Sequence, residues 1–365
     1  MDWTRREFGK LAGAAAAASM LPRAQAEDSR EGRKIGWCIV ALGRISMGHF
    51  MPGMKESRAG RIVALVSGHR EKAERQAVMY GVPDRAIYDY ENYDRIADNK
   101  EIDAVYIALP NGMHAEYTIR AAKAGKHVLC EKPMATSVAD SQAMIGACRA
   151  AGKKLMIAYR CQYEPVNLKA ISLIRSGAIG QVQAIESANG FNIGKGEWRL
   201  NLKMSGGGPL LDVGIYSLNA SRYLTGEEPG EIRANTSVVD HDGRFTEVEE
   251  NVGWTMKFPS GILSSCNTSY GADMNGFYRV HGSKGMIELS PAFGYEGIHM
   301  RAHIWGQPPI DMPSPQHGYE QFTVQADYFA DCIRNNKEPK SDGEEGLRDT
   351  KYMQQIYKSA GLTRL

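Results

Sequence analysis

A lysine, an aspartate and a tyrosine stand where they could move a proton. Lys132, in Glu131-Lys132-Pro133, follows an apolar run, and a lysine at a strand end can polarise a substrate oxygen. Asp212 and Tyr216 follow three glycines and, four residues apart, share one helix face. Together they could take a hydroxyl proton while hydride leaves the carbon. A surface lysine, an aspartate that supports a helix start and a core tyrosine are the alternatives.

A degraded nucleotide-binding motif occupies residues 41–46. Of the pattern G-x-G-x-x-G only the middle glycine, Gly43, remains, with Ala41 and Ser46 at the outer positions. The middle glycine lets backbone N–H groups approach a pyrophosphate at a helix N-terminus. A simple tight turn is the alternative, but the position between a buried strand and a helix favours a nucleotide. The predicted pyrophosphate contacts are Leu42, Gly43, Arg44 and Ile45.

The end of the second predicted strand indicates which nucleotide is bound. An NAD enzyme places a carboxylate there for the ribose 2′-hydroxyl. This chain has Ser67-Gly68-His69-Arg70-Glu71-Lys72, with no carboxylate at the strand end and two cations nearby. That pattern favours the 2′-phosphate of NADP, with solvated surface charge as the alternative. The predicted contacts are Ser67, Gly68, His69, Arg70 and Lys72.

Strand-like and helical patterns alternate over residues 34–158, which predicts a doubly wound parallel sheet that binds ligands at its carboxyl edge. After residue 160, long strand-like runs between Glu231 and Leu289 predict a mostly antiparallel open sheet with helices. The expected fold is therefore α/β: a Rossmann domain over 27–158 and an α+β domain over 159–365, with the final helices packing back on the first domain. The predicted strands of the first sheet are Lys34–Val40, Arg61–Val66, Ala104–Ala108, His127–Cys130 and Lys154–Ala158.

Residues 1–26 have the pattern of a twin-arginine export signal. Arg5-Arg6 precedes an apolar stretch from Leu11 to Leu21, and Ala24-Gln25-Ala26 is a small-x-small cleavage pattern. A general secretory signal and an ordinary N-terminal helix are the alternatives. The twin-arginine machinery exports folded proteins, so a cytoplasmic cofactor could be loaded before export. In the periplasm that cofactor could not exchange, and the enzyme would have to oxidise and reduce with one bound nicotinamide.

Composition excludes several partner classes. The 365-residue chain has a formal charge of +2, and without the predicted signal the balance becomes about −2, which does not suggest nucleic acid or an anionic membrane. No later stretch reaches the roughly 20 apolar residues that span a bilayer. The six cysteines have no paired spacing, so we interpret them as small core residues and expect neither a metal site nor a disulfide framework.

From about residue 34 to the end, these motifs resemble the glucose–fructose oxidoreductase (Gfo/Idh/MocA) family. The run from Asp212 to Asn219 is the most specific. Most of the broad family has histidine where Tyr216 stands, and tyrosine resembles the glucose–fructose and aldose–aldose oxidoreductases. The other stretches that carry the resemblance are residues 109–114, 125–137, 158–161, 198–200 and 206–223.

The resemblance implies roles for individual residues. Lys132 would contact nicotinamide and substrate, Tyr216 would be the catalytic acid/base, and Asp212 would help to hold a sugar. It also implies NADP(H) that stays bound through turnover. The family's long proline-rich N-terminal arm is missing, since only residues 27–33 precede the first strand, so we expect a homodimer through the open sheet face. Further implied cofactor or active-site contacts are Tyr90, Leu109, Asn111, His114, Glu131, Arg160, Trp198, Arg199 and Tyr295.

These observations predict a ping-pong sugar oxidoreductase. One aldopyranose would be oxidised at C1 to its lactone, and a second sugar would be reduced to an alditol. The rivals are a sugar 1-dehydrogenase with an exchanging nicotinamide, a nicotinamide-dependent glycosidase, and a non-catalytic sugar-binding protein that keeps its cofactor as a structural plug.

Overall fold

The first sheet is parallel and is built from the strands that the sequence predicted, with one short addition. The computed structural model describes residues 32–364, and the predicted export signal lies outside them. The sheet has the order β3-β2-β1-β4-β5-β6, which confirms a doubly wound fold. Every residue of β1 is buried, as a central parallel strand requires. Its strands are β1 (Ile35–Val40), β2 (Gly60–Val66), β3 (Ile87–Tyr88), β4 (Ala104–Ile107), β5 (His127–Cys130) and β6 (Leu155–Ile157).

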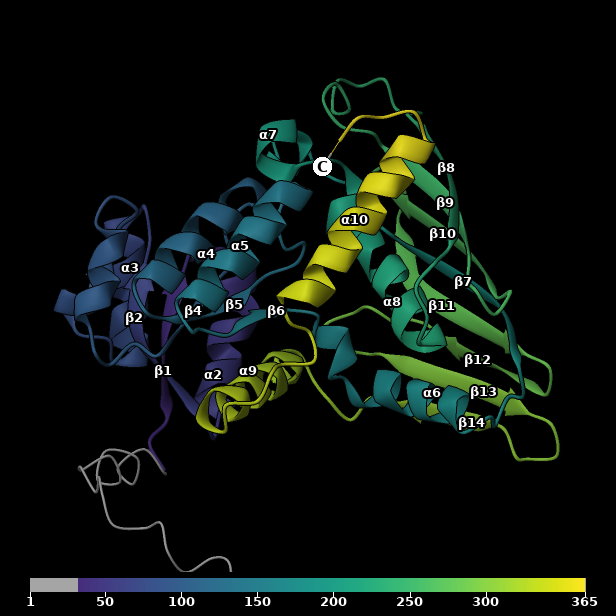
Figure 1. Cartoon of the computed structure of the whole chain (residues 1–365), viewed down its shortest axis with the longest axis horizontal. Coiled ribbons are helices and arrows are strands. Elements are labelled where there is room, and N and C mark those ends of the chain that lie inside the picture. The colour runs from purple at the N-terminus through teal and green to yellow at the C-terminus, as the bar shows by residue number, and fades with distance from the viewer. Residues whose placement is uncertain (1–31, 365) are drawn as a thin grey trace, which may run out of the picture. The chain divides into compact units, whose positions relative to one another are not determined.

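Helices connect these strands as crossovers (Figure 1). The connection after β1 begins with a π-helical turn, Ser46–Phe50, which continues into α2. Ser137 caps the helix after β5 by accepting a hydrogen bond from the Asp140 N–H. The crossover helices are α2 (Met51–Glu56), α3 (Arg70–Tyr80), α4 (His114–Lys123) and α5 (Val138–Ala150).

The second sheet has eight strands in the order β14-β13-β12-β11-β7-β10-β9-β8. Its pairs are antiparallel except β7 with β10, so the predicted mostly antiparallel sheet is confirmed. The prediction ended the strands at Leu289, and the structure adds two beyond it. The strands are β7 (Val182–Gly190), β8 (Glu231–Ser237), β9 (Asn251–Lys257), β10 (Leu263–Ser269), β11 (Met274–Gly282), β12 (Gly285–Leu289), β13 (His299–Ile304) and β14 (Ile310–Pro313).

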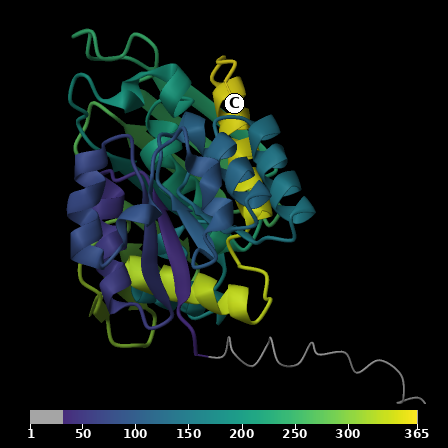
Figure 2. The ribbon, with the colours of Figure 1, turned by 90° about the vertical axis from the view of Figure 1, so that its left-hand side faces the viewer.

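Four helices pack against the two sheets, and one of them, α10, contacts strands of both. Helices α6 (Pro165–Arg175) and α8 (Ile215–Thr225) contact strands of the second sheet. Helix α9 (Glu320–Arg334) contacts α2 and β2, and Figure 2 views it beside the first sheet. Helix α10 (Gly343–Ser359) contacts β6 and α5 on one side and α8 and β8 on the other (Figure 1). Residues 34–364 belong to one compact unit, in which α10 contacts both sheets.

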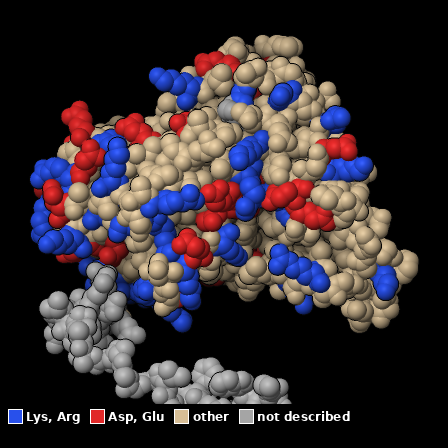
Figure 3. Space-filling model, in the orientation of Figure 1, with Lys and Arg blue, Asp and Glu red and all other residues tan. Residues whose placement is uncertain are grey.

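The surface charges are mixed in sign, and the cysteines lie in the interior. On the face in Figure 3, basic and acidic side chains are interspersed. No helix within residues 32–364 is long and apolar enough to cross a membrane. Six cysteines are buried and unpaired: Cys38, Cys130, Cys148, Cys161, Cys266 and Cys332.

A buried charge network fastens α10 to α8. The Arg222 guanidinium on α8 donates to Asp349 (2.5 Å), Glu345 (2.9 and 3.1 Å) and Glu228 (2.7 and 2.8 Å). Asp349 is fully buried, and burial raises its pKa to about 6 against the charge of Arg222. Asn219, one turn before Arg222, donates to both Glu345 and Asp349. This network holds α8, the helix that carries Tyr216, against α10.

We predict that Arg222→Met lowers the free energy of unfolding by about 3–5 kcal/mol, because it leaves the buried Asp349 without its cation and Glu345 with only the half-exposed Arg348. The matched control is Arg348→Met, which removes a half-exposed arginine that also bonds Glu345 and should cost less than about 1 kcal/mol. Urea unfolding of both variants measures the difference. Equal losses would show that the buried network is not what joins the helices.

Candidate active site

The nucleotide loop keeps the geometry of its motif although it has lost two glycines. Ala41, in the place of the first glycine, has φ 77°, a left-handed conformation that costs a residue with a Cβ roughly 1–2 kcal/mol. A Cβ on Gly43 would meet no atom within 4 Å, so there is open space beside its backbone. The helical turns that follow direct an N-terminus toward this space. These features fit a pyrophosphate at Gly43.

The loop after β2 is the predicted site of the 2′-phosphate. The Ser67 hydroxyl accepts from the His69 N–H (3.1 Å), which shapes the turn. A Cβ on Gly68 would lie 3.1 Å from the Tyr90 ring, so the bare backbone packs on that aromatic side chain. Lys72 reaches the Leu42 carbonyl in the nucleotide loop (Nζ–O 3.4 Å). The structure therefore brings Ser67, Gly68, Tyr90 and Lys72 to one loop cluster beside the pyrophosphate turn.

Arg70 lies at the start of α3 and forms surface ion pairs. Its guanidinium pairs with Glu74 (2.8 Å) and with Asp84, so two carboxylates already balance its charge. Glu74 lies one helical turn after Arg70, an i,i+4 spacing that the motif-based prediction did not weigh. Of the two cations predicted for the phosphate, Lys72 is the one that faces the nucleotide loop.

Asn111 and His114 connect loops beneath the site. The Asn111 amide donates to the Ser205 carbonyl (2.8 Å), which ties the end of β4 to the segment before Pro209. The His114 ring nitrogens lie 2.8 Å from the Leu109 carbonyl oxygen and 2.9 Å from that of Pro133. Burial lowers the pKa of His114, and the hydrogen bonds to the two carbonyls oppose that shift. Both side chains therefore fix the loops on which Leu109 and Lys132 lie.

The predicted catalytic residues meet at the carboxyl end of β5. The Lys132 ammonium lies 3.4 Å from Asp212 Oδ1 and donates to the Asp212 carbonyl (2.5 Å). The same ammonium lies 4.8 Å from the centre of the Tyr216 ring. Asp212 belongs to a π-helical turn, Leu210–Gly214, and Tyr216 to the start of α8; π-turns are frequent at functional sites. The fold thus brings Lys132 next to Asp212 and Tyr216, which lie 80 or more positions later in the chain.

Asp212 is the most highly connected carboxylate of the site. Its second oxygen accepts from Arg199 Nε (2.7 Å) and from the Tyr270 hydroxyl (3.1 Å). Burial by itself raises the pKa of this carboxyl, but Lys132, Arg199 and the Tyr270 hydrogen bond outweigh burial and hold the pKa below its usual value. The lowered pKa favours the anionic form of Asp212, which pairs with Lys132.

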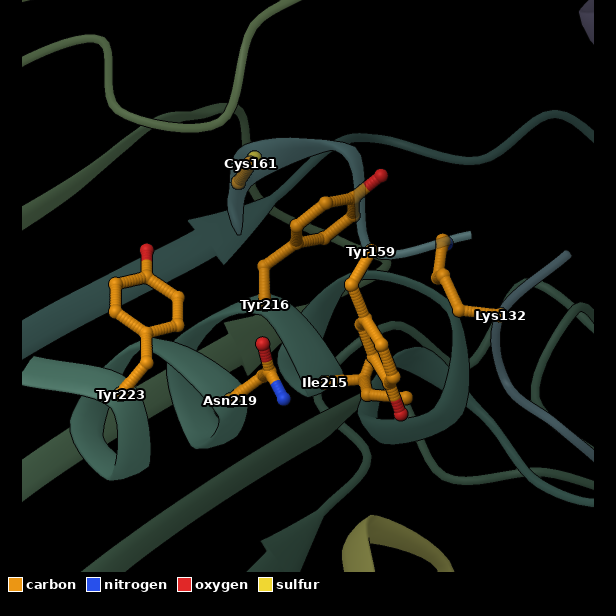
Figure 4. A pocket seen from close by; sticks show the side chains of 7 residues that line it. All are labelled: Lys132, Tyr159, Cys161, Ile215, Tyr216, Asn219 and Tyr223. Atoms are coloured by element: carbon orange, nitrogen blue, oxygen red, sulfur yellow. The ribbon is translucent and has the colours of Figure 1, made fainter. Parts of the chain in front are cut away.

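Tyr216 lies in a small pocket between the two sheets (Figure 4). Its hydroxyl accepts a hydrogen bond from Arg160 (3.2 Å), whose guanidinium also lies 5.1 Å from the ring centre. Burial raises the pKa of Tyr216 above its usual value, and the charge of Arg160 opposes that rise. The pocket is lined by Lys132, Tyr159, Cys161, Ile215, Tyr216, Asn219 and Tyr223.

The remaining predicted contacts surround this pocket. Tyr295 stacks on His49 (4.1 Å between ring centres) and lies under Arg160, and burial raises its pKa to about 12. Arg199 lies over the Trp198 ring (4.6 Å) in the turn Trp198–Leu200. Just before that turn, Glu197 forms an ion pair with Arg44 of the nucleotide loop.

Sequence reasoning missed four residues that shape the site. Tyr270 holds Asp212, Gln321 accepts from Arg160 (2.7 Å), and His49 stacks on Tyr295. Tyr106 donates to Glu131 (2.6 Å), a carboxyl whose pKa burial raises. Tyr270 directly follows β10 and the other three lie in β4 and in helical turns, all without a local motif, so only the pairing of distant elements identifies them.

A Rossmann sheet with a lysine, a tyrosine and an aspartate at its carboxyl edge defines a nicotinamide-dependent oxidoreductase. A model of the oxidoreductase family with an NAD-binding Rossmann fold (GFO/IDH/MocA) matches residues 35–159. The model of the GFO/IDH/MocA C-terminal domain matches residues 167–288. The chain belongs to the Gfo/Idh/MocA family.

Individual relatives support this assignment. The crystal structure of aldose–aldose oxidoreductase from Caulobacter crescentus, complexed with glycerol, superposes with a TM-score of 0.87 at 45% identity, over 90% of this chain and 98% of the other. D-xylose 1-dehydrogenase [NADP(+)] of Haloarcula marismortui is 30% identical over 92% of this chain and 93% of its own. Levoglucosan dehydrogenase shares the fold, with a TM-score of 0.79 at 21% identity over 90% of this chain and 98% of the other.

We predict that Asp212→Asn lowers turnover by about 10²-fold, because Lys132 loses the charge that positions it and small misplacements of catalytic groups cost about that much. The control Tyr270→Phe keeps the carboxylate and removes one hydrogen bond, which should cost less than about tenfold. Steady-state rates of the two variants test this. Similar losses in both would mean that the charge of Asp212 is not what positions Lys132.

Proposed function

We propose that this protein is a sugar oxidoreductase with non-dissociating NADP(H). It oxidises an aldopyranose at C1 to the lactone and then reduces a second sugar, an aldose or ketose, to an alditol. The observation that carries the proposal is the meeting of Lys132, Asp212 and Tyr216 at the carboxyl edge of the Rossmann sheet. The likeness to an aldose–aldose oxidoreductase supports the substrate class.

In this proposal Tyr216 transfers the proton and Lys132 supplies positive charge at the reacting oxygen. Tyr216 takes the C1 hydroxyl proton of the first sugar and gives a proton to the carbonyl oxygen of the second. Lys132, a cation held by Asp212, polarises the reacting oxygen. A bound nicotinamide would supply the hydride acceptor for the first sugar and the hydride donor for the second. One proton and one hydride leave the first sugar and both reach the second, so the full cycle balances.

NADP is proposed over NAD because no carboxylate stands at the end of β2, whereas Lys72 faces the nucleotide loop. Tight binding is proposed from the export signal over residues 1–26, which would carry the folded protein through the twin-arginine machinery to the periplasm. There the enzyme would have no nicotinamide pool to exchange with. We also propose a homodimer through the open face of the second sheet.

A second candidate is an NADP-dependent sugar 1-dehydrogenase with an exchanging cofactor. The similarity to D-xylose 1-dehydrogenase over nearly the full length of both chains favours it. It needs the same chemistry at Tyr216 but only one sugar. The two candidates differ in whether the cofactor leaves between turnovers.

An experiment on protein purified without added nicotinamide distinguishes the two candidate functions. We expect an aldose such as glucose or xylose to produce the near-ultraviolet band of reduced nicotinamide, and a second sugar to abolish it, because both half-reactions use one bound cofactor. If no band forms and activity requires external NADP, the exchanging dehydrogenase is the correct function.

Tyr216→Phe should lower turnover by about 10²–10⁴-fold while the cofactor stays bound, since a general acid–base group contributes about that factor. Absorbance of the purified variant reports cofactor content, and product formation reports the rate. Tyr278→Phe is the control: it also removes a buried hydroxyl, which donates to Asn167 (3.1 Å) away from the pocket lining, and should retain turnover. Near-normal turnover of Tyr216→Phe would remove Tyr216 from the acid–base role.

A further inference from the structure

Arg160 is a buried cation whose hydrogen bonds do not balance its charge. It stands in the turn Arg160–Gln162 after β6 and is 4% exposed. Its guanidinium donates to the carbonyls of Phe293 (2.5 Å) and Gly294 (2.8 Å), to the Gln321 amide oxygen (2.7 Å) and to the Tyr216 hydroxyl (3.2 Å). None of these four acceptors, all within residues 32–364, is a carboxylate.

A buried charge without a counter-ion costs free energy, so a neighbouring group that becomes negative would be stabilised by Arg160. Burial raises the pKa of Glu131, Cys161 and Tyr216 alike, and in each case the charge of Arg160 opposes that rise. Tyr216 is the ionisable group that Arg160 bonds directly, and a phenolate there would supply the missing counter-ion. The charged and titratable side chains that face Tyr216 are Glu131, Lys132, Arg160, Cys161 and Tyr295.

Lys132 is balanced in a way that Arg160 is not. The Lys132 ammonium makes its hydrogen bonds to the carbonyl and carboxylate of Asp212, and it faces the Tyr216 ring at 4.8 Å. Arg160 instead donates to the phenol oxygen itself. The two cations around Tyr216 therefore have different partners: Lys132 has an anion already, and Arg160 gains one when Tyr216 ionises.

We propose that Arg160 is a positioning residue that stabilises the deprotonated form of Tyr216, in which it can accept the C1 hydroxyl proton. This inference rests on the proposed function. In the first half-reaction the proton moves to the Tyr216 oxygen, and the electron pair leaves C1 with the hydride. In the second, Tyr216 returns that proton to the oxygen of the acceptor sugar, and the phenolate beside Arg160 is restored.

The direct test removes the charge of Arg160. We expect Arg160→Gln to raise the apparent pKa of Tyr216 by about one to three, because a nearby opposite charge favours an ionised group by about that much. The pKa is read without sugar, as the phenolate absorbance of the protein minus that of the same protein carrying Tyr216→Phe. The reduction of bound cofactor by an aldose should slow by about tenfold or more below that pKa and recover as pH rises. Arg160→Lys should restore part of both.

A second pair of variants leaves Arg160 in place. Gln321→Glu puts a carboxylate where the amide now accepts from Arg160, which gives the guanidinium a competing anion. Gln321→Met is the matched control, since both variants lose the amide donations to Gly294 and Tyr295 and only one adds charge. We expect the glutamate variant to have the higher Tyr216 pKa and a half-reaction about tenfold slower than that of the methionine variant at the same pH.

The outcomes are distinct. An unchanged Tyr216 pKa in Arg160→Gln, or equal pKa values in the two Gln321 variants, would overturn the role of Arg160 even if both half-reactions occur. A rate loss in Arg160→Gln that raised pH does not recover, with no change in the tyrosine titration, would assign Arg160 a structural role. If the unmodified protein never reduces a bound cofactor but Tyr216 still titrates as expected, the proposed function fails and the electrostatic role of Arg160 stands.

Discussion

The site depends on one buried carboxylate held between two cations. Asp212 contacts Lys132, which ends a strand of the first sheet, and Arg199 and Tyr270, which come from segments around the second. A carboxylate in this setting is stable only because several donors reach it, since burial alone would favour its neutral form. The need to satisfy that charge fixes the position of Lys132 relative to Tyr216. The site could not be built from either sheet alone.

The same rule operates at two further points between the sheets. Arg222 joins α8 to α10 through Glu345 and Asp349, and Arg160 joins the end of β6 to the loop at Phe293 and Gly294. The first arginine is matched by carboxylates, and the second has only neutral acceptors. A charge that is fully matched stabilises the fold, whereas a charge left partly unmatched remains available to act on a neighbouring group. We therefore assign Arg222 a structural role between α8 and α10, and we propose that Arg160 acts on Tyr216.

Local patterns predicted the elements well where burial repeats along the chain. The parallel strands were readable because a central strand such as Ile35–Val40 is apolar throughout. Strands β13 and β14 were missed because in β13 exposed polar and charged residues alternate with the buried ones, and none of the four residues of β14 is buried. Ala41 shows the limit of motif reading: the left-handed turn persists without its glycine, because the fold imposes the conformation.

The sequence by itself determined the residue types at the site and the ends of the strands that carry them. Motif position and helix spacing, which are local properties, singled out Lys132, Asp212 and Tyr216, and the family resemblance supplied their predicted roles. Tertiary structure decided which charges meet. In the folded chain Arg70 forms ion pairs with Glu74 and Asp84. Lys132 bonds Asp212, and Arg160 donates to Tyr216. Partner choice depends on burial and distance in three dimensions, and neither is encoded by spacing along the chain.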